Sequence, residues 1–310
     1  MELVIQIALL AIGFLMLVKG ADYFVDGAAG IATKFGIPQL VVGLTIVAMG
    51  TSAPEAAVSI TGAMSGAADI AVGNVVGSNI LNILIILGIT GVIATVAVQK
   101  STLMIEIPFM LLITLVLIVL GMTGNELTFV EGIVFWVLFI IYLAYLFVLA
   151  KKGTEEDVPE ERPVWKLLLF ILVGFGFVIW GANISVNAAT AIATAIGISE
   201  KFIGLTIVAL GTSLPELVAS VTAARKGNAD IAIGNIVGSN IFNILFVLGT
   251  SALITPIPYQ STFLFDGVIT VLAGVLLWVA TIRKRELNRD WGIVMLVCYA
   301  VYLAYLLFQG

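Results

Sequence analysis

The stretch GLTIVAMGTSAPE at residues 43–55 recurs as GLTIVALGTSLPE at residues 204–216. A second matched pair follows, ADIAVGNVVGSNILNIL at 68–84 and ADIAIGNIVGSNIFNIL at 229–245. At an offset of 161, 33 of the 53 positions from 36 to 88 are identical to those from 197 to 249. Weaker similarity continues outward at an offset of 160, where YLAYL occurs at 142–146 and 302–306. The chain is therefore predicted to be one unit repeated twice.

The composition indicates a membrane protein. Apolar residues make up 61% of the 310 residues and charged residues only 11%, whereas soluble domains carry about 25% charged residues. The mean hydropathy is +1.19, so most of the surface must face a lipid bilayer. The net charge of -5 and the lack of a basic surface exclude nucleic acid as a partner. Histidine is absent and Cys298 is the single cysteine, which excludes disulfides and thiolate or imidazole metal sites.

Apolar stretches long enough to cross a bilayer follow one another along the chain. We predict an all-α integral membrane protein with ten transmembrane helices at 3–32, 40–63, 70–94, 103–121, 127–150, 166–193, 202–223, 231–254, 262–282 and 291–309. Residues 1–150 form the first five-helix repeat, 151–165 a polar cytoplasmic linker and hinge, and 166–310 the second repeat. Because five is odd, the second repeat enters the membrane from the opposite side. Such inverted repeats are typical of alternating-access transporters.

The basic residues predict the orientation. Of the 14 Lys and Arg, 12 lie in loops after odd-numbered helices; only Lys201 follows an even-numbered one, and Lys19 lies within the first helix. Basic loops remain in the cytoplasm. We therefore expect a multi-pass protein of the inner or plasma membrane with both termini extracellular or periplasmic. Glu2 stands where a secretory signal would carry basic residues, so the first helix is predicted to be retained.

The repeated GTSxPE motif predicts a cation site. Pro54 lacks an N–H, so it kinks the second helix and frees backbone carbonyls beside Glu55. A glutamate within the membrane costs about 2.5 kcal/mol or more to insert, and Glu216 repeats it in the seventh helix. The helical interiors near them offer no basic residue, so a cation is the simplest partner for the combined charge of -2. Oxygen ligands suit Ca2+ or Na+ and argue against zinc, copper or iron.

Polar residues of the third and eighth helices extend this pattern. Ser78 and Asn82 are one helical turn apart and share a face, and Ser239 and Asn243 match them. Other features have structural interpretations: helix packing for Gly73 and Gly77, and interhelical hydrogen bonds for Asn74, Asn79 and their repeat partners. We expect a structural ion pair of Asp22 and Asp26 with Lys19, positions near helix ends for the unduplicated Glu106 and Glu131, and amino-terminal caps at Asp69 and Asp230.

The motif GTSxPE followed by GNxxGSNIxNI in each half resembles the alpha repeats of the calcium/cation antiporter superfamily, in particular prokaryotic sodium/calcium exchangers. The resemblance covers essentially the whole chain. It implies a central calcium site of Glu55, Glu216 and the carbonyls of Thr51 and Thr212. It implies one flanking sodium site at the Ala48 carbonyl, Ser52 and Ser78; a mirror site at the Ala209 carbonyl, Ser213 and Ser239; and Asn82 and Asn243 lining the middle.

One position separates this sequence from some members of that superfamily. Potassium-dependent exchangers carry an aspartate where this chain has Asn243, so the resemblance implies potassium independence. Large cytoplasmic regulatory domains, as in animal exchangers, are missing from the sequence, so calcium regulation through them is not expected.

The function predicted from the sequence is secondary active antiport of Ca2+ against Na+ by alternating access. The two cations compete for one site, and the long first and sixth helices are expected to slide against the rest. A proton/calcium antiporter is the alternative because glutamates in a low dielectric can bind protons. A channel and an intramembrane hydrolase are the other candidates, and no loop is long enough for an ATPase domain. We therefore expect no enzymatic activity, no cofactor and no obligate protein partner; Ca2+ and Na+ are the substrates, and the lipid bilayer surrounds the protein.

Overall fold

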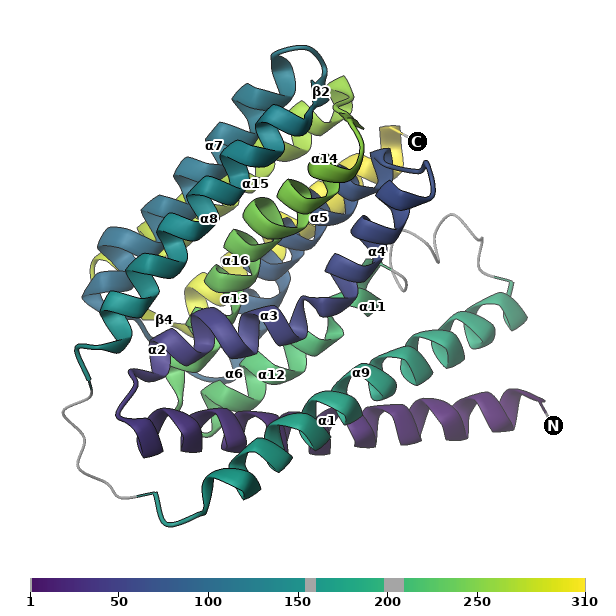
Figure 1. Ribbon diagram of the computed structural model, residues 1–310. Coiled ribbons are helices and arrows are strands. Elements are labelled where there is room, and N and C mark those ends of the chain that lie inside the picture. Colours follow the sequence, from purple (N-terminus) through teal and green to yellow (C-terminus); the bar gives the residue numbers. More distant parts are fainter. Residues whose placement is uncertain (1, 154–159, 198–208, 310) are drawn as a thin grey trace.

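The computed structural model describes residues 2–153, 160–197 and 209–309, and this part of the chain is almost entirely helical (Figure 1). The first half contains α1 (Glu2–Phe35), α2 (Gln39–Val42), η1 (Gly43–Val47), α3 (Ala48–Thr51), α4 (Ala53–Met64), α5 (Asp69–Leu81), η2 (Asn82–Leu87), α6 (Gly88–Ile93), β1 (Val96–Ala97), η3 (Thr102–Glu106), α7 (Ile107–Met122), β2 (Glu126–Leu127) and α8 (Phe129–Ala150). The second half contains α9 (Val164–Ala195), α11 (Ala209–Thr212), α12 (Leu214–Arg225), α13 (Ala229–Phe242), η5 (Asn243–Leu248), α14 (Gly249–Ile254), β3 (Ile257–Pro258), α15 (Ser261–Ile282), β4 (Glu286–Leu287) and α16 (Arg289–Gln309). The elements marked η are π-helical.

The helices have the length and apolarity of a multi-pass membrane protein. Within the described residues, eight helices are long and apolar enough to cross a bilayer, and a bent pair, Gln39–Thr51 with Ala53–Met64, makes a ninth. All nine coincide with predicted spans. The other predicted span, 202–223, begins outside the described residues, and so does most of the predicted hinge in the linker.

The predicted break in the second helix is present. The bent pair changes direction by 51° at Ser52, whose backbone (φ -81°, ψ 8°) leaves the helical region. Pro54 stands in the first turn of α4, where its missing N–H costs no helical hydrogen bond. Ser213 (φ -89°, ψ 4°) makes the same break between α11 and α12. Each break places a glutamate in the first turn of the helix that follows.

The long helices α1 and α9 pack antiparallel against each other at one side of the molecule (Figure 1). Their contact is made backbone to backbone at glycines: a Cβ on Gly20 would lie 2.8 Å from the Gly174 carbonyl oxygen, and one on Gly13 would lie 2.9 Å from the Gly181 carbonyl oxygen. Small residues let membrane helices approach this closely. The two helices predicted to slide therefore form one tightly joined pair.

Short strands of the first half pair with short strands of the second half. β1 pairs antiparallel with β4, and β2 pairs antiparallel with β3. β1 and β3 follow the third and eighth predicted spans, whereas β2 and β4 precede the fifth and tenth. Each sheet thus joins one half to the other, and exchanging the halves converts one sheet into the other.

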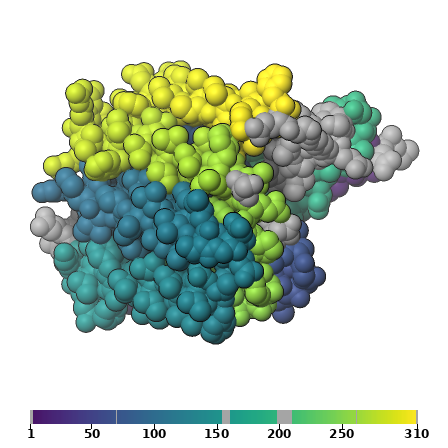
Figure 2. All heavy atoms as spheres, turned by 90° about the horizontal axis from the view of Figure 1, so that it is seen from above, coloured from purple at the N-terminus to yellow at the C-terminus, as the bar shows by residue number. Residues whose placement is uncertain are grey.

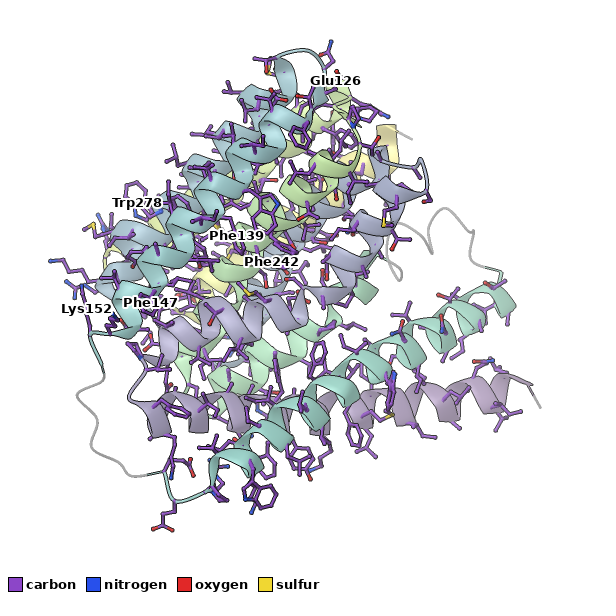
Figure 3. The ribbon with its side chains drawn as sticks, in the orientation of Figure 1. Glu126, Phe139, Phe147, Lys152, Phe242 and Trp278 are labelled. Carbon is purple, nitrogen blue, oxygen red and sulfur yellow. The ribbon has the colours of Figure 1, made fainter. Side chains whose placement is uncertain are left out.

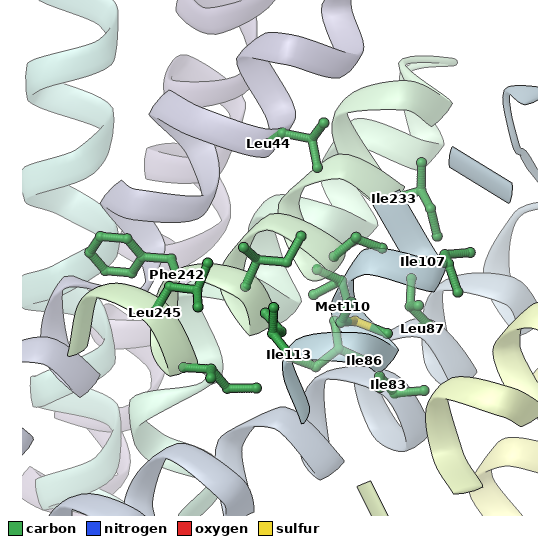
Figure 4. Close-up of a cluster of buried hydrophobic side chains, with 14 of the residues drawn as sticks. Leu44, Ile83, Ile86, Leu87, Ile107, Met110, Ile113, Ile233, Phe242 and Leu245 are labelled. Atoms are coloured by element: carbon green, nitrogen blue, oxygen red, sulfur yellow. The ribbon is translucent and has the colours of Figure 1, made fainter. Parts of the chain in front are cut away.

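The helices that carry the repeated motifs lie in the centre. In the most apolar 18 residues of the segment Ala229–Ile254, 94% of the residues are buried, against 11% in those of Arg289–Phe308. Figure 4 shows apolar side chains of this segment packed with those of the first half. In Figure 3 Phe139 of α8 lies beside Phe242 of α13, with ring centroids 6.1 Å apart. Figure 2 shows the peripheral helices on one face, α7 and α8 in blue and teal and α15 and α16 in green and yellow.

Candidate cation site

Two buried carboxylates lie at the helix breaks and are hydrogen-bonded across the two halves. Glu55 and Glu216 are both 0% exposed. Ser52 Oγ donates to Glu216 Oε1 at 2.8 Å, and Ser213 Oγ donates to Glu55 Oε1 at 3.4 Å. Each serine stands three residues before the glutamate of its own half. The serine at each helix break therefore donates a hydrogen bond to the carboxylate of the other half. These two bonds place both carboxylates between the two helix breaks, as the predicted meeting of the acids requires.

Two asparagines hold the backbone at these glutamates. Asn74 Nδ2 donates to the Glu55 carbonyl oxygen at 3.1 Å and to Ser59 Oγ at 2.9 Å. In the second half, Asn235 Nδ2 donates to the Glu216 carbonyl oxygen at 3.3 Å and to Ser220 Oγ at 2.9 Å. These amides act as the interhelical hydrogen bonds that the sequence predicts, and they fix each glutamate against the next helix.

Four further asparagines join α5 and η2 to α13 and η5. The Asn79 and Asn240 side chains each donate to the backbone carbonyl of the other at 3.2 Å. Asn82 Nδ2 donates to Asn240 Oδ1 at 2.9 Å, and Asn243 Nδ2 donates to Asn79 Oδ1 at 3.1 Å. This reciprocal network engages the amide N–H groups of Asn82 and Asn243 and leaves their side-chain oxygens free.

The buried polar atoms that remain unsatisfied in this region are hydrogen-bond acceptors. Glu55 Oε2, Glu216 Oε2, Asn82 Oδ1 and Asn243 Oδ1 have no hydrogen-bond partner, and their side chains are 0% exposed. A buried acceptor without a partner costs about 1–3 kcal/mol, and more if charged. Within the described residues, no basic side chain lies within 4.0 Å of either carboxylate. A hard cation satisfies such oxygens together and neutralises the charge.

The remaining predicted ligands are mostly buried side chains of the repeated motifs. Thr51, Ser52, Ser213 and Ser239 are 0–2% exposed and Ser78 is 4% exposed, Thr212 is half-buried, and Ala209 begins α11. Thr51 Oγ1 contacts the Ala48 carbonyl at 3.3 Å and Asn235 Oδ1 at 3.0 Å.

One grouping implied by the resemblance differs from the geometry. Ser239 Oγ donates to the Ala48 carbonyl oxygen at 3.4 Å, although the resemblance grouped Ser239 with Ala209 and placed Ser78 beside Ala48. The reason is that α13 of the second half packs against η1 and α3 of the first. The hydroxyl beside the Ala48 carbonyl therefore comes from the other repeat.

The glycine interpretation is confirmed for the second repeat, whereas the segment that would pack on Gly73 and Gly77 by the repeat, residues 201–208, lies outside the described residues. Cβ atoms on Gly234 and Gly238 would come within 3.1 Å of the Leu40–Ala48 segment, so these glycines permit close packing. Gly73 makes only ordinary contact with Phe263, and Gly77 has no neighbour within 4 Å among the described residues.

Two expectations about other acidic residues were wrong, and the one for Glu131 was confirmed. Asp22 and Asp26 pair with Lys226, the residue directly after α12, at 3.2 and 2.8 Å, and not with Lys19, because α12 packs against α1. The residues predicted to be caps lie inside their helices: α5 starts at Asp69 after the cap residue Ala68, and Asn228 is the cap residue of α13. Glu131 does form a capping box with Thr128.

Glu106 is the acidic residue that the sequence reasoning underestimated. It lies near the start of its span, as expected, but is 0% exposed. It is also not unduplicated, because at the outer offset of 160 its counterpart is Asp266. The repeat offset changes from 161 in the motifs to 160 in the outer helices, and applying the offset of 160 to Glu106 identifies Asp266 as its counterpart.

Comparisons with known proteins identify the family of this chain. The family model described as "Sodium/calcium exchanger protein" matches residues 5–148 and 166–308. The putative antiporter CaxA of Alkalimonas amylolytica is 38% identical, with 96% of this chain and 97% of that protein covered. Sodium/calcium exchanger MaX1 of Methanosarcina acetivorans is 31% identical, with 98% and 99% covered. The solved structure of the sodium-calcium exchanger NCX_Mj superimposes with a TM-score of 0.86 at 32% identity, covering 98% of this chain and 99% of that one. This chain therefore belongs to the sodium/calcium exchanger protein family.

Proposed function

We propose that this protein is a secondary antiporter that exchanges Ca2+ for Na+ across the cell membrane. The observation that carries the proposal is the cluster of four buried, unpartnered acceptor oxygens from Glu55, Glu216, Asn82 and Asn243. Two carboxylates balance the charge of one Ca2+, and Na+ ions bind the same oxygens in its absence. Because Ca2+ and Na+ need the same carboxylates, they cannot bind at the same time. This competition makes the transport of one ion depend on the countertransport of the other.

We assign the flanking sodium positions from the hydrogen bonds. One consists of the Ala48 carbonyl, Ser52, Ser239 and Glu216, since Ser52 contacts Glu216 and Ser239 contacts Ala48. Its mirror consists of the Ala209 carbonyl, Ser213, Ser78 and Glu55, supported by the Ser213 to Glu55 bond. The carbonyls of Thr51 and Thr212 complete the central calcium position. This grouping exchanges Ser78 and Ser239 relative to the one that the sequence resemblance implies.

The architecture proposed for this function is two inverted five-helix repeats, 1–150 and 166–310, joined by the linker 151–165, with ten spans in all. The reciprocal asparagine bonds and the exchanged strand pairs support a twofold relation between the halves. The distribution of 12 basic residues against one supports a cytoplasmic linker and outer termini.

Alternating access is proposed to occur by sliding of the joined pair α1 and α9 against the central helices. The pair suits this role because its glycine contacts bind its members to each other, while the acidic motifs belong to α4 and α12. Transport is proposed to be independent of potassium because Asn243 supplies an amide and no third carboxylate to the centre.

Ion flux in proteoliposomes tests the proposal. An outward sodium gradient at equal pH on both sides should drive Ca2+ uptake, and added K+ should leave the rate unchanged. Glu55→Gln and Glu216→Gln should each abolish uptake, while Glu126→Gln, at an exposed glutamate in β2 (Figure 3), should not. Uptake driven by a proton gradient and indifferent to sodium would establish the proton-coupled alternative, and uptake retained in both Gln variants would refute the site.

A further inference from the structure

A groove of about 470 Å3 lies between α15 and α16, two peripheral helices that Figure 2 shows on one face. α16 packs mainly on α6 and η2, and α15 packs mainly on α7 and α5, so the two helices of this pair barely touch each other. Leu84 of η2 lines the groove and is 3% exposed. The exchange reaction proposed for Glu55 and Glu216 does not use this groove.

The lining of the groove is almost entirely apolar. Three of its residues, Leu272, Val297 and Val301, are more than half exposed. The hydroxyl of Tyr302, which also lines the groove, donates to Asp266 Oδ1 at 2.9 Å and is therefore already paired within the protein. Because α15 and α16 have the length and apolarity of membrane spans, the groove opens toward the hydrocarbon of the bilayer and not toward water.

Two small residues make the groove larger than its counterpart in the first half. At the repeat offset of 160, the equivalent hollow between α7 and α8 has a volume of about 210 Å3. Ala273 and Cys298 line the groove at positions where the first half carries Ile113 and Leu138. Shortening packed apolar side chains leaves empty space unless the neighbours collapse into it. The second half thus has a hollow that its own side chains do not fill.

The groove has the dimensions of one hydrocarbon chain. With a rise of about 1.5 Å per residue, the helical stretch from Phe265 to Leu276 that lines it is about 16 Å long. One leaflet contributes about half of the hydrocarbon core of roughly 30 Å, or about 15 Å. Spread over about 16 Å, the volume of 470 Å3 corresponds to a cross-section of about 30 Å2, whereas an α-helix with its side chains is about 10 Å across and needs about 80 Å2. The groove is therefore too narrow for a helix of another protein.

One end of the groove lies near the membrane surface. Phe265 and Tyr305, which line it from the two helices, have ring centroids 4.5 Å apart. They lie close to the start of α15 and the end of α16, whereas Leu276 and Val297 lie deeper in the two spans. Tyrosine is enriched at membrane–water interfaces. A chain in the groove therefore runs from the interface toward the middle of the bilayer, as a lipid tail does.

We propose that this groove binds one acyl chain of a membrane phospholipid, with the polar head beyond Tyr305. Lipid tails are as apolar as the lining, so a hydrophobic driving force does not select the chain. Contact selects it, because a tail in the groove touches α15, α16 and Leu84, whereas a tail on a convex helix surface touches the protein on one side only. Dispersion attraction grows with the number of such contacts. The proposal is independent of the ions that the central site exchanges.

Photolabelling of the full-length protein in phosphatidylcholine vesicles tests the proposal. The vesicles contain a small fraction of a phosphatidylcholine with a diazirine midway along one tail, and mass spectrometry locates the labelled residues. Leu84 should be labelled because it lines the groove. Leu245, its counterpart in η5 at the offset of 161, is 0% exposed and should remain unlabelled. Absence of label at Leu84 in the unmodified chain would overturn the proposal, whatever ions the protein transports.

A double variant fills the groove with the residues of the first half. Ala273→Ile combined with Cys298→Leu should abolish the labelling of Leu84. Val275→Leu, at an exposed position of α15 outside the lining, is the matched control and should leave the labelling unchanged. Label retained at Leu84 in the double variant would contradict the assignment.

The single cysteine distinguishes a lipid tail from a second copy of the chain. Cys298 is exposed and lines the groove, so oxidative crosslinking can be applied to the unmodified protein in the same vesicles. The chain should remain uncrosslinked, because a lipid tail offers no thiol. A dimer joined through Cys298 of both chains would show that protein covers the groove, and it would overturn the proposal even where the double variant fails to fold.

Discussion

Substitution of Gly174 by alanine tests the backbone contact between α1 and α9. A Cβ at this position would lie 2.4 Å from the Phe24 nitrogen and 2.6 Å from the Gly20 carbonyl oxygen, whereas ordinary contact begins at 3.4 Å. Since both atoms belong to the backbone of α1, the helices must separate by about 1 Å. Overpacking of this kind costs about 1–3 kcal/mol.

The same helix provides a matched control. A Cβ on Gly176, two residues further along α9, would meet no atom within 4 Å among the described residues. Alanine raises helix propensity by about 1 kcal/mol at either position, so this contribution cancels between the two variants. Gly176→Ala should be neutral or stabilising, and Gly174→Ala should be less stable than Gly176→Ala by about 1–3 kcal/mol.

Stability can be followed as the fraction of detergent-purified protein that remains monodisperse after heating, with sodium-driven Ca2+ uptake measured on the same preparations. Gly174→Ala should lose monodispersity at a lower temperature than Gly176→Ala and should transport more slowly, because the pair proposed to slide as one body is loosened. Equal stability of the two variants would refute the argument from close approach.

Three further predictions concern the polar ends of helices. Lys226→Gln removes partly exposed ion pairs with α1 and should lower stability by less than about 1 kcal/mol, an effect that high salt erases in thermal unfolding. The hydrogen-bonded Arg162 guanidinium lowers the pKa of Glu160 from 4.5 to about 2; this carboxyl therefore stabilises the fold fully above pH 4.5 and progressively less as the pH falls toward 2. Glu160→Gln should remove that part of the acid-unfolding profile, and an unchanged profile would contradict the assignment. Thr128→Ala breaks the capping box with Glu131 and should cost about 1 kcal/mol, while Thr128→Ser retains the box.

The positions of the helices and the two central acids follow from the sequence because their signals are local or repeated. Apolar runs determine the spans, Pro54 and Pro215 determine the breaks, and the duplication pairs Glu55 with Glu216. The two acids lie close together because they occupy equivalent positions of the two repeats, and these positions approach each other.

Contacts between non-equivalent positions did not follow from the sequence. Lys226 binds the α1 aspartates, and Ser239 contacts the Ala48 carbonyl. Both contacts depend on which helix of one half crosses which helix of the other, and a pattern along one chain does not contain that crossing. The burial of Glu106 was missed for a different reason, because a one-residue change of offset concealed its relation to Asp266.

The exchanged strands have a consequence for biosynthesis. When the first five helices have left the ribosome, β1 and β2 still lack the strands with which they pair, since β4 and β3 are made later. The Asn79 amide likewise waits for the Asn240 carbonyl, 161 residues downstream. The first half must therefore persist in the bilayer as an unfinished intermediate, and native structure can close around the pocket only after nearly the entire polypeptide has been inserted.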